Sequence, residues 1–139
     1  MHDLATLVLD AIPADATAIG GLTMGADGVS FITAGVAATQ GRALSAFSVR
    51  KKVKDHGAGG RIAGVLRRGD RVVITEDTVT RGTSLLEAAH VAQEVGAEVV
   101  LILAVVDRGG TAEAMTAKDG LKFQALFSAL DLGFPYEGA

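Results

Sequence analysis

Hydrophobic positions along the chain change repeatedly between helical and strand-like spacing. Leu4, Leu7, Val8 and Ala11 recur at helical spacing, which predicts a helix over the first dozen residues. By the same criteria we expect helices at 26–39, 85–95 and 111–118, and strands at 17–20, 44–49, 71–75, 98–106 and 121–127. Strands that alternate with helices form a parallel sheet covered on both faces, so the pattern predicts an α/β fold.

The segment 50–66 departs from this alternation. It has no sustained apolar period and contains four glycines, so we expect a long mobile loop, a kind of segment that is often functional. Eight of the thirteen Lys and Arg lie between Arg50 and Arg71. This cluster indicates either a local anion site or a solvated basic loop, and charge alone leaves both open.

Composition narrows the class of protein further. With 139 residues, 49% of them hydrophobic, the chain fits a single globular domain, 1–139. The net charge of −3 argues against a nucleic-acid partner, and the absence of cysteine excludes disulfides and thiolate metal sites. No apolar run approaches the roughly 20 residues of a membrane span, and the first residues lack a basic signal-peptide end. We therefore expect a cytoplasmic protein with no membrane contact.

The segment 71–90, RVVITEDTVTRGTSLLEAAH, carries the most specific chemistry. Glu76 and Asp77 follow a predicted buried strand, and a polar loop with Gly82 leads into a helix. Ligands of open parallel sheets bind beyond the carboxyl ends of the strands, which is where this loop should lie. The acids suit sugar hydroxyls or a hydrated Mg²⁺, whereas the helix start suits a phosphate.

Hydroxyl side chains add donors at this helix start, from Thr80, Thr83 and Ser84. Ser84 and Glu87 also have the spacing of a capping box, so a helix cap that binds nothing stays an alternative for these residues. Acids at one end and phosphate donors at the other together suit a ribose 5-phosphate.

The whole string resembles the phosphoribosyl pyrophosphate (PRPP) signature of type I phosphoribosyltransferases: four apolar-type residues, two acids, two further residues, then Thr-x-Gly-x-Ser. The resemblance implies that family's fold, a mostly parallel sheet flanked by helices. It also implies that Glu76 and Asp77 bind the ribose hydroxyls, with Asp77 catalytic. The other implied PRPP contacts are Thr78, Val79, Thr80, Arg81, Gly82, Thr83 and Ser84. Arg81 departs from the family, in which many members have a small residue.

Three further segments resemble the orotate phosphoribosyltransferase family. The first, 50–57 (RKKVKDHG), is similar to that family's catalytic loop, Arg-Lys-x-x-Lys-Asp-His-Gly. Loss of pyrophosphate concentrates negative charge on the leaving group, and positive side chains on a closing loop stabilise it. The implied pyrophosphate contacts are Arg50, Lys51, Lys54 and His56. The family pattern implies that Lys54 and His56 are catalytic and reach the neighbouring site of a homodimer.

The second and third segments follow two other predicted strands. The stretch 20–27 resembles the family's pyrophosphate-binding loop, although a tight strand-to-helix turn is equally compatible. The loop residues implied by this resemblance are Gly21, Leu22, Thr23, Met24 and Gly25. Arg108 stands where the family's Asp-Arg pair supplies the arginine for the orotate carboxylate, a group that a guanidinium binds bidentately. The implied orotate contacts are Thr80 and Arg108; a surface arginine paired with Asp107 is the alternative.

The resemblance covers nearly the whole chain, but the family carries a further segment before the first helix, which forms part of a hood over the base. We therefore expect either a truncated chain or a natural short form. The leading hypothesis is transfer of the phosphoribosyl group from PRPP to orotate in pyrimidine biosynthesis. The alternatives are transfer to another base and a non-catalytic PRPP- or nucleotide-binding regulatory module. Mg²⁺ is expected to bind mainly through PRPP, near Glu76 and Asp77.

Overall fold

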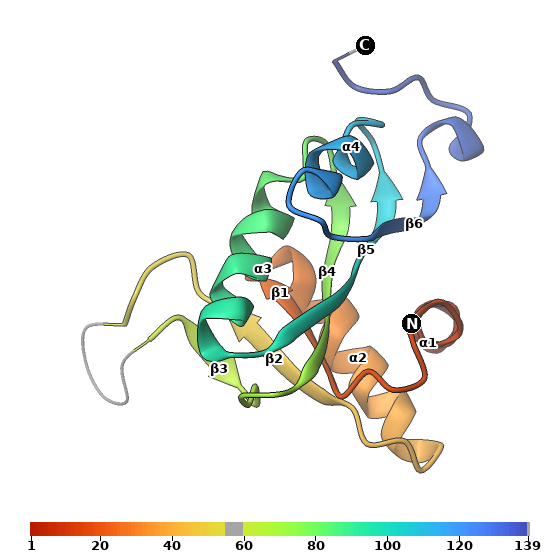
Figure 1. Cartoon of the computed structure of the whole chain (residues 1–139). Coiled ribbons are helices and arrows are strands. Elements are labelled where there is room, and N and C mark those ends of the chain that lie inside the picture. The colour runs from red at the N-terminus through yellow and green to blue at the C-terminus, as the bar shows by residue number, and fades with distance from the viewer. Residues whose placement is uncertain (55–59, 139) are drawn as a thin grey trace.

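The computed structural model describes residues 1–54 and 60–138 of the chain. Its centre is a six-stranded sheet with the strand order β3-β2-β1-β4-β5-β6 (Figure 1). The strands are β1 (Ala18–Leu22), β2 (Ser45–Val49), β3 (Ile62–Gly64), β4 (Arg71–Val79), β5 (Glu98–Asp107) and β6 (Phe123–Ser128). Neighbouring strands pair in parallel except for β2 and β3, which are antiparallel. The predicted mostly parallel α/β fold is confirmed.

Helices cover both faces of this sheet. They are α1 (His2–Ala11), α2 (Gly25–Thr39), α3 (Thr83–Val95), α4 (Ala112–Ala117) and the short 3-10 helix η1 (Leu130–Leu132). Helices α1 and α2 share one hydrophobic cluster with the sheet, and α3 and α4 share the other. Within residues 1–54 and 60–138, none of these helices combines the length and the apolar character that crossing a membrane requires.

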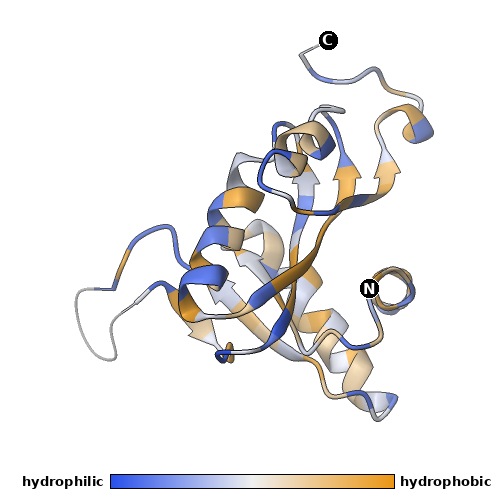
Figure 2. Ribbon diagram, in the orientation of Figure 1, coloured by the Kyte–Doolittle hydropathy of each residue, from blue (hydrophilic) through white to orange (hydrophobic). Residues whose placement is uncertain are grey.

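The two clusters divide the side chains of each central strand. In β4, Val72 and Ile74 pack under α3, whereas Val73 packs under α1 and α2. In β5, Ile102 joins the first cluster and Leu103 the second. Successive side chains of a strand point to opposite faces, so a strand covered on both sides is a continuous apolar run. Figure 2 shows this for β5, which is hydrophobic over most of its length.

In the half of the sheet opposite β6, the edge strand β3 and the inner strand β1 differ from the sequence-based expectations. β3 lies inside the segment 50–66, which we expected to be a loop without regular structure. It is too short to produce a hydrophobic period and forms because β2 offers an antiparallel pairing edge. β1 continues through Gly21 and Leu22, which pair with Ser48 and Val49 of β2. The expected loop 21–25 is therefore shorter than predicted.

β4 continues beyond Thr75 to Val79, so Glu76 and Asp77 lie inside the strand and not after it. The cause is pairing with the long strand β5, where Thr78 is opposite Val106. A neighbouring strand that supplies backbone partners outweighs the low strand preference of acidic residues.

Helix α3 begins at Thr83, two residues before the predicted start. Gly82 is its N-cap with a φ of 93°, a left-handed conformation that strongly favours glycine. The capping-box interpretation is wrong, because Ser84 lies inside the helix and Glu87 instead forms an ion pair with Arg61. Gly96 ends the helix in a left-handed conformation, which is common at helix C-termini. The other predicted elements differ from the observed ones mainly at their ends.

Candidate functional site

The loops that follow β1, β4 and β5 meet at one edge of the sheet, because these strands are parallel neighbours. From β1 the chain passes through α2 to β2 on one side, and from β4 it passes through α3 to β5 on the other (Figure 1). The order therefore reverses between β1 and β4. A reversal of this kind is where open α/β sheets bind their ligands.

The acidic pair lies against the first residue of α2. A Cβ atom added to Gly25 would be 2.6 Å from Oε1 of Glu76 and 2.9 Å from Oδ1 of Asp77. Only a residue without a side chain lets both carboxylates approach this closely. Oδ1 of Asp77 also accepts a hydrogen bond of 2.7 Å from the N–H of Thr78. The loop after β1 and the acids of β4, which we predicted separately, thus form one feature.

The loop after β1 is closed onto the helix that follows it. The hydroxyl of Thr23 donates a 2.8 Å hydrogen bond to Oδ2 of Asp27, in the first turn of α2. Met24 is exposed over 80% of its surface, so its side chain contributes little to packing. The loop therefore presents its backbone and the start of α2 at the carboxyl ends of β1 and β4. Backbone N–H groups at a helix start are groups that bind anions.

The carboxyl of Glu76 has a perturbed pKa. This pKa is raised from 4.5 to about 7, chiefly by burial and secondly by the neighbouring charge of Asp77, whereas Lys51 opposes the rise. The carboxyl is therefore close to its titration midpoint near neutral pH. A hydroxyl donor or a cation bound beside it would favour the charged form.

The turn between β4 and α3 surrounds a cavity of about 300 Å³. Its lining residues are Glu76, Thr78, Val79, Thr80, Arg81, Gly82, Thr83 and Ser84. The first helical hydrogen bond of α3 runs from the N–H of Leu86 to the carbonyl of Gly82, at 3.0 Å. The N–H groups before Leu86 are therefore available to a ligand, as at any helix start. The structure brings together the turn residues predicted from the sequence.

The loop after β5 is built around Asp107. Its carboxylate accepts hydrogen bonds from the N–H groups of Gly109 and Gly110, at 3.0 and 2.9 Å. The guanidinium of Arg108 instead forms an ion pair with Glu137. The alternative in which Arg108 pairs with Asp107 is therefore wrong.

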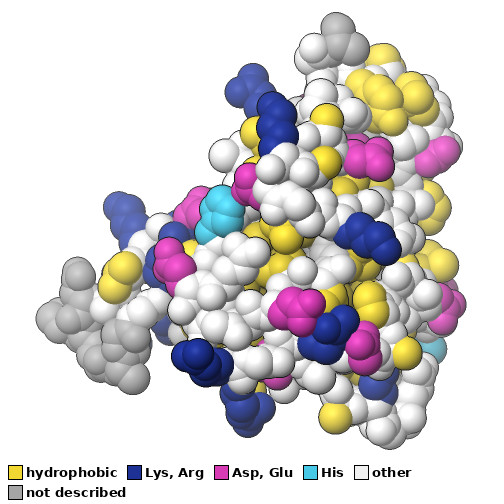
Figure 3. Space-filling model, in the orientation of Figure 1, with side chains coloured by type: hydrophobic (Ala, Val, Ile, Leu, Met, Phe, Trp, Pro, Cys, Tyr) yellow, Lys and Arg dark blue, Asp and Glu magenta, His cyan; other side chains and the backbone are white. Residues whose placement is uncertain are grey.

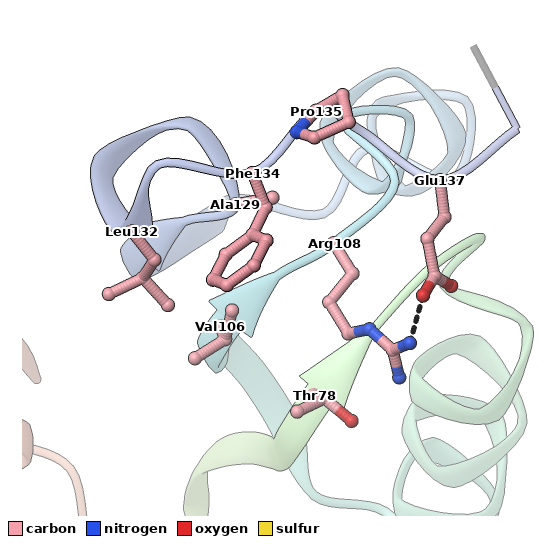
Figure 4. A pocket seen from close by; sticks show the side chains of 8 residues that line it. All are labelled: Thr78, Val106, Arg108, Ala129, Leu132, Phe134, Pro135 and Glu137. Atoms are coloured by element: carbon pink, nitrogen blue, oxygen red, sulfur yellow. Dashed lines mark hydrogen bonds and ion pairs between the residues drawn. The ribbon is translucent and has the colours of Figure 1, made fainter.

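Arg108 borders a second cavity, of about 520 Å³ (Figure 4). Its lining residues are Thr78, Val106, Arg108, Ala129, Leu132, Phe134, Pro135 and Glu137. Figure 4 shows Phe134, Leu132 and Val106 on one side and the guanidinium of Arg108 between Thr78 and Glu137 on the other. One side of the cavity is therefore apolar, and the other carries the charge.

Sequence reasoning found Arg108 but missed Glu137 and the apolar wall. One signal was available, because four of the six aromatic residues of this aromatic-poor chain lie between 123 and 136. Of these four, Phe134 is the one that lines the cavity, so the clustering indicates the segment that forms the wall and not the individual wall residues.

The structure describes only part of the basic segment 50–66. Arg50 and Arg61 brace its two ends: the guanidinium of Arg50 donates to the carbonyl of Ile62 at 3.2 Å, and Nε of Arg61 donates to the carbonyl of Arg50 at 2.8 Å. Lys54 is exposed, and His56 lies outside the described residues. Figure 3 shows Lys and Arg side chains on the side of the molecule where β3 lies. The predicted pyrophosphate contacts of this segment stay predictions.

The acidic pair fits a Mg²⁺ ion only in part. Glu76 and Asp77 supply the hard oxygen ligands that Mg²⁺ prefers. Among the residues that the structure describes, no group of three or more His, Asp and Glu side chains could hold a metal. A Mg²⁺ ion here would therefore take most of its ligands from water and a bound phosphate compound.

Fold and site together define a type I phosphoribosyltransferase, with a hydroxyl-lined turn joining the acid-bearing strand to its helix. Orotate phosphoribosyltransferase of Mycobacterium tuberculosis H37Rv, solved in complex with Fe(III) dicitrate, has a TM-score of 0.85 to this chain. It is 38% identical, and the match covers 96% of this chain and 75% of that one. The chain belongs to the orotate phosphoribosyltransferase family.

Two other comparisons agree. The same M. tuberculosis enzyme, solved in complex with PRPP, has a TM-score of 0.80 and is 36% identical, over 96% of this chain and 75% of that chain. Orotate phosphoribosyltransferase of Streptomyces avermitilis is 44% identical over 120 residues, 86% of this chain and 66% of that protein. This chain thus spans about two thirds of the length of the curated relatives it matches. No family model matches it.

Proposed function

We propose that this protein transfers the 5-phosphoribosyl group of PRPP to orotate, giving orotidine 5-phosphate and pyrophosphate in pyrimidine biosynthesis. The observation that carries the proposal is the crevice in which the acids of β4, the start of α2 and the turn before α3 adjoin. The crevice offers a phosphate site on either side of two carboxylates that can accept hydrogen bonds from sugar hydroxyls. This arrangement matches a sugar phosphorylated at both ends. The M. tuberculosis relative solved with PRPP supports the same ligand.

Each part of the crevice has an assigned role. The turn 78–84 holds the 5-phosphate through its N–H groups and hydroxyls, and the loop 21–25 faces the pyrophosphate end. Glu76 and Asp77 accept hydrogen bonds from the ribose hydroxyls. Mg²⁺, when bound, neutralises charge on the pyrophosphate, and the same two carboxylates would help to hold it.

Transfer breaks the bond between ribose C1 and the pyrophosphate oxygen and forms a bond from C1 to a nitrogen of the base, which gives up its proton to the leaving pyrophosphate or to water. Positive charge develops on the ribose, where the Asp77 carboxylate stabilises it. Negative charge develops on the leaving pyrophosphate, for which the basic segment supplies partners: Arg50, Lys51, Lys54 and His56. The effect of Lys51 on the Glu76 pKa supports this assignment, because it requires the start of that segment to approach the crevice.

The base binds beside the crevice, in the cavity bordered by Arg108 and Thr78. An apolar wall on one side and a guanidinium on the other suit a planar base that carries a carboxylate. Thr78 lines both cavities. Thr80 of the same turn accepts a 3.1 Å hydrogen bond through its carbonyl from the hydroxyl of Thr111, which connects this turn to the loop after β5. We further propose a cytoplasmic homodimer, in which Lys54 and His56 serve the neighbouring site.

The test is an orotate absorbance assay with PRPP and Mg²⁺, with the omission of each as the control. We expect loss of the orotate signal only when both are present. Other pyrimidine and purine bases are assayed in parallel. Turnover of another base but not of orotate would replace the proposed acceptor. Calorimetric binding of PRPP without turnover of any base would favour the regulatory module.

A further inference from the structure

The cavity that we assign to the base already contains a carboxylate from the chain itself. Glu137 forms an ion pair with the guanidinium of Arg108 inside the lining of this cavity (Figure 4). A second contact anchors the same residue, because the N–H of Glu137 donates a 2.7 Å hydrogen bond to the carbonyl of Arg108. The backbone bond keeps the glutamate beside the arginine whatever its side chain does.

We propose that Glu137 takes the place of the substrate carboxylate at Arg108 in the free protein, and that binding of a carboxylated base exchanges one carboxylate for the other. This inference rests on the function proposed above and adds a residue that tunes affinity for the base. Arg108 thereby keeps an anionic partner both with and without the base.

The ion pair between Arg108 and Glu137 can be exchanged at little energetic cost. Its side chains are 46% and 49% exposed, and pairs in contact with water contribute little to stability. The pair joins one guanidinium nitrogen to one carboxylate oxygen. A planar carboxylate that faces the fork can instead make two parallel hydrogen bonds, which is the stronger arrangement.

The segment that carries Glu137 is also weakly packed. Leu132 is 49% exposed and Phe134 is 66% exposed, so apolar burial does little to hold the segment in one position. Figure 3 shows hydrophobic side chains gathered at the upper right of the molecule, over the region that follows β6. The segment can therefore adjust around Leu132 and Phe134 when the glutamate side chain leaves Arg108, while the backbone hydrogen bond of Glu137 stays in place.

The exchange affects different bases differently. A base with a carboxylate must displace Glu137 and gains only the difference between two ion pairs. A base without a carboxylate has nothing to offer Arg108 and leaves the pair intact. Removing the charge of Glu137 should therefore change the affinity for orotate and not for uracil.

The experiment compares the chain with its Glu137→Gln variant by calorimetric titration with orotate and with uracil, at low and high salt. We expect the Kd for orotate to fall about twofold to fivefold in the variant, the range of a half-exposed pair. The Kd for uracil should not change. The orotate Kd should also become more sensitive to salt, because binding now creates an ion pair and no longer exchanges one.

Two further variants separate this effect from a general change of charge. Glu137→Asp keeps the carboxylate and should restore most of the lower affinity of the natural chain. Glu113→Gln removes the same charge from an exposed position of α4 and should leave the orotate Kd unchanged. An equal effect of the Glu113 and Glu137 variants would overturn the proposal, and so would identical orotate binding, or none, in the natural chain and Glu137→Gln.

The titration needs no turnover, so it separates this inference from the proposed function. Tighter orotate binding by Glu137→Gln without conversion of orotate by the natural chain would refute the transferase and keep the exchange. Conversion of orotate with an unchanged Kd in the variant would refute the exchange and keep the transferase.

Discussion

Replacing Gly25 by Ala tests the centre of the proposed site directly. The new methyl group would lie 2.6 Å from Oε1 of Glu76 and 2.9 Å from Oδ1 of Asp77, both too close for carbon and oxygen. The atoms that it meets are the ends of flexible side chains, so the carboxylates can rotate away while the backbone stays. We therefore expect a folded protein whose acidic pair is displaced.

The expected magnitudes differ for stability and binding. Alanine is a better helix former than glycine by about 1 kcal/mol in a helix interior, and at the first residue of α2 a smaller part of this difference offsets the cost of moving the two carboxylates. A hydrogen bond to a charged group contributes about 1.5–3 kcal/mol. Loss of one such bond to the ribose should weaken PRPP binding roughly tenfold to hundredfold.

The assay pairs a calorimetric Kd for PRPP in the presence of Mg²⁺ with a thermal unfolding curve. Gly28→Ala is a matched control in the same helix, because a Cβ there meets nothing within 4 Å in the described structure. It should stabilise the protein by up to about 1 kcal/mol and leave the Kd unchanged. A folded Gly25→Ala protein with the natural Kd for PRPP would refute the assignment of these carboxylates to the ribose.

Three other predictions follow from single side chains. Lys54→Ala should lower kcat roughly a hundredfold with little change in the PRPP Kd, because its charge acts on the leaving group; steady-state kinetics with an unchanged kcat would contradict this role. Because the pKa of Glu76 is raised in the folded protein, its contribution to stability is complete below pH 4.5 and is lost as the pH rises through about 7. Glu76→Gln should therefore flatten the dependence of the unfolding free energy on pH across that window. Parallel curves for the two proteins would show that Glu76 is not the titrating group. Thr75→Val should stabilise the chain by about 1 kcal/mol in denaturant unfolding, because the buried hydroxyl of Thr75 has no hydrogen-bond partner among the described residues; a destabilised variant would indicate that this hydroxyl has a partner in solution.

The part of the site that could be predicted is local in sequence. Glu76 of β4, Gly82 and the hydroxyls of the next turn lie within nine residues, 76–84, and the structure keeps them together at the 300 Å³ cavity. Neighbours this close along the chain can hardly be separated by folding. The predicted length of β4 was too short for the opposite reason. Pairing with β5 extends the strand, and the presence of a partner strand leaves no pattern in the local sequence.

Contacts between residues that are distant in the sequence could be recognised only in the folded molecule. Glu137 meets Arg108 across 29 residues, and no pattern in either segment indicates the pair. Gly25 meets Glu76 because β1 and β4 are parallel neighbours, which sets two carboxyl ends side by side. The sequence gives no reason for a glycine at position 25, and the reason became visible only when its neighbours Glu76 and Asp77 were known.

The sequence by itself determined the fold class, the two-sided burial of the central strands and the chemistry of the segment 71–90, because each is written in short-range spacing of side chains. The tertiary structure alone decided which carboxylates face Gly25, which carboxylate holds Arg108 and which apolar residues wall its cavity. These depend on strand order and on the path of the segment after β6, and packing between distant segments settles both.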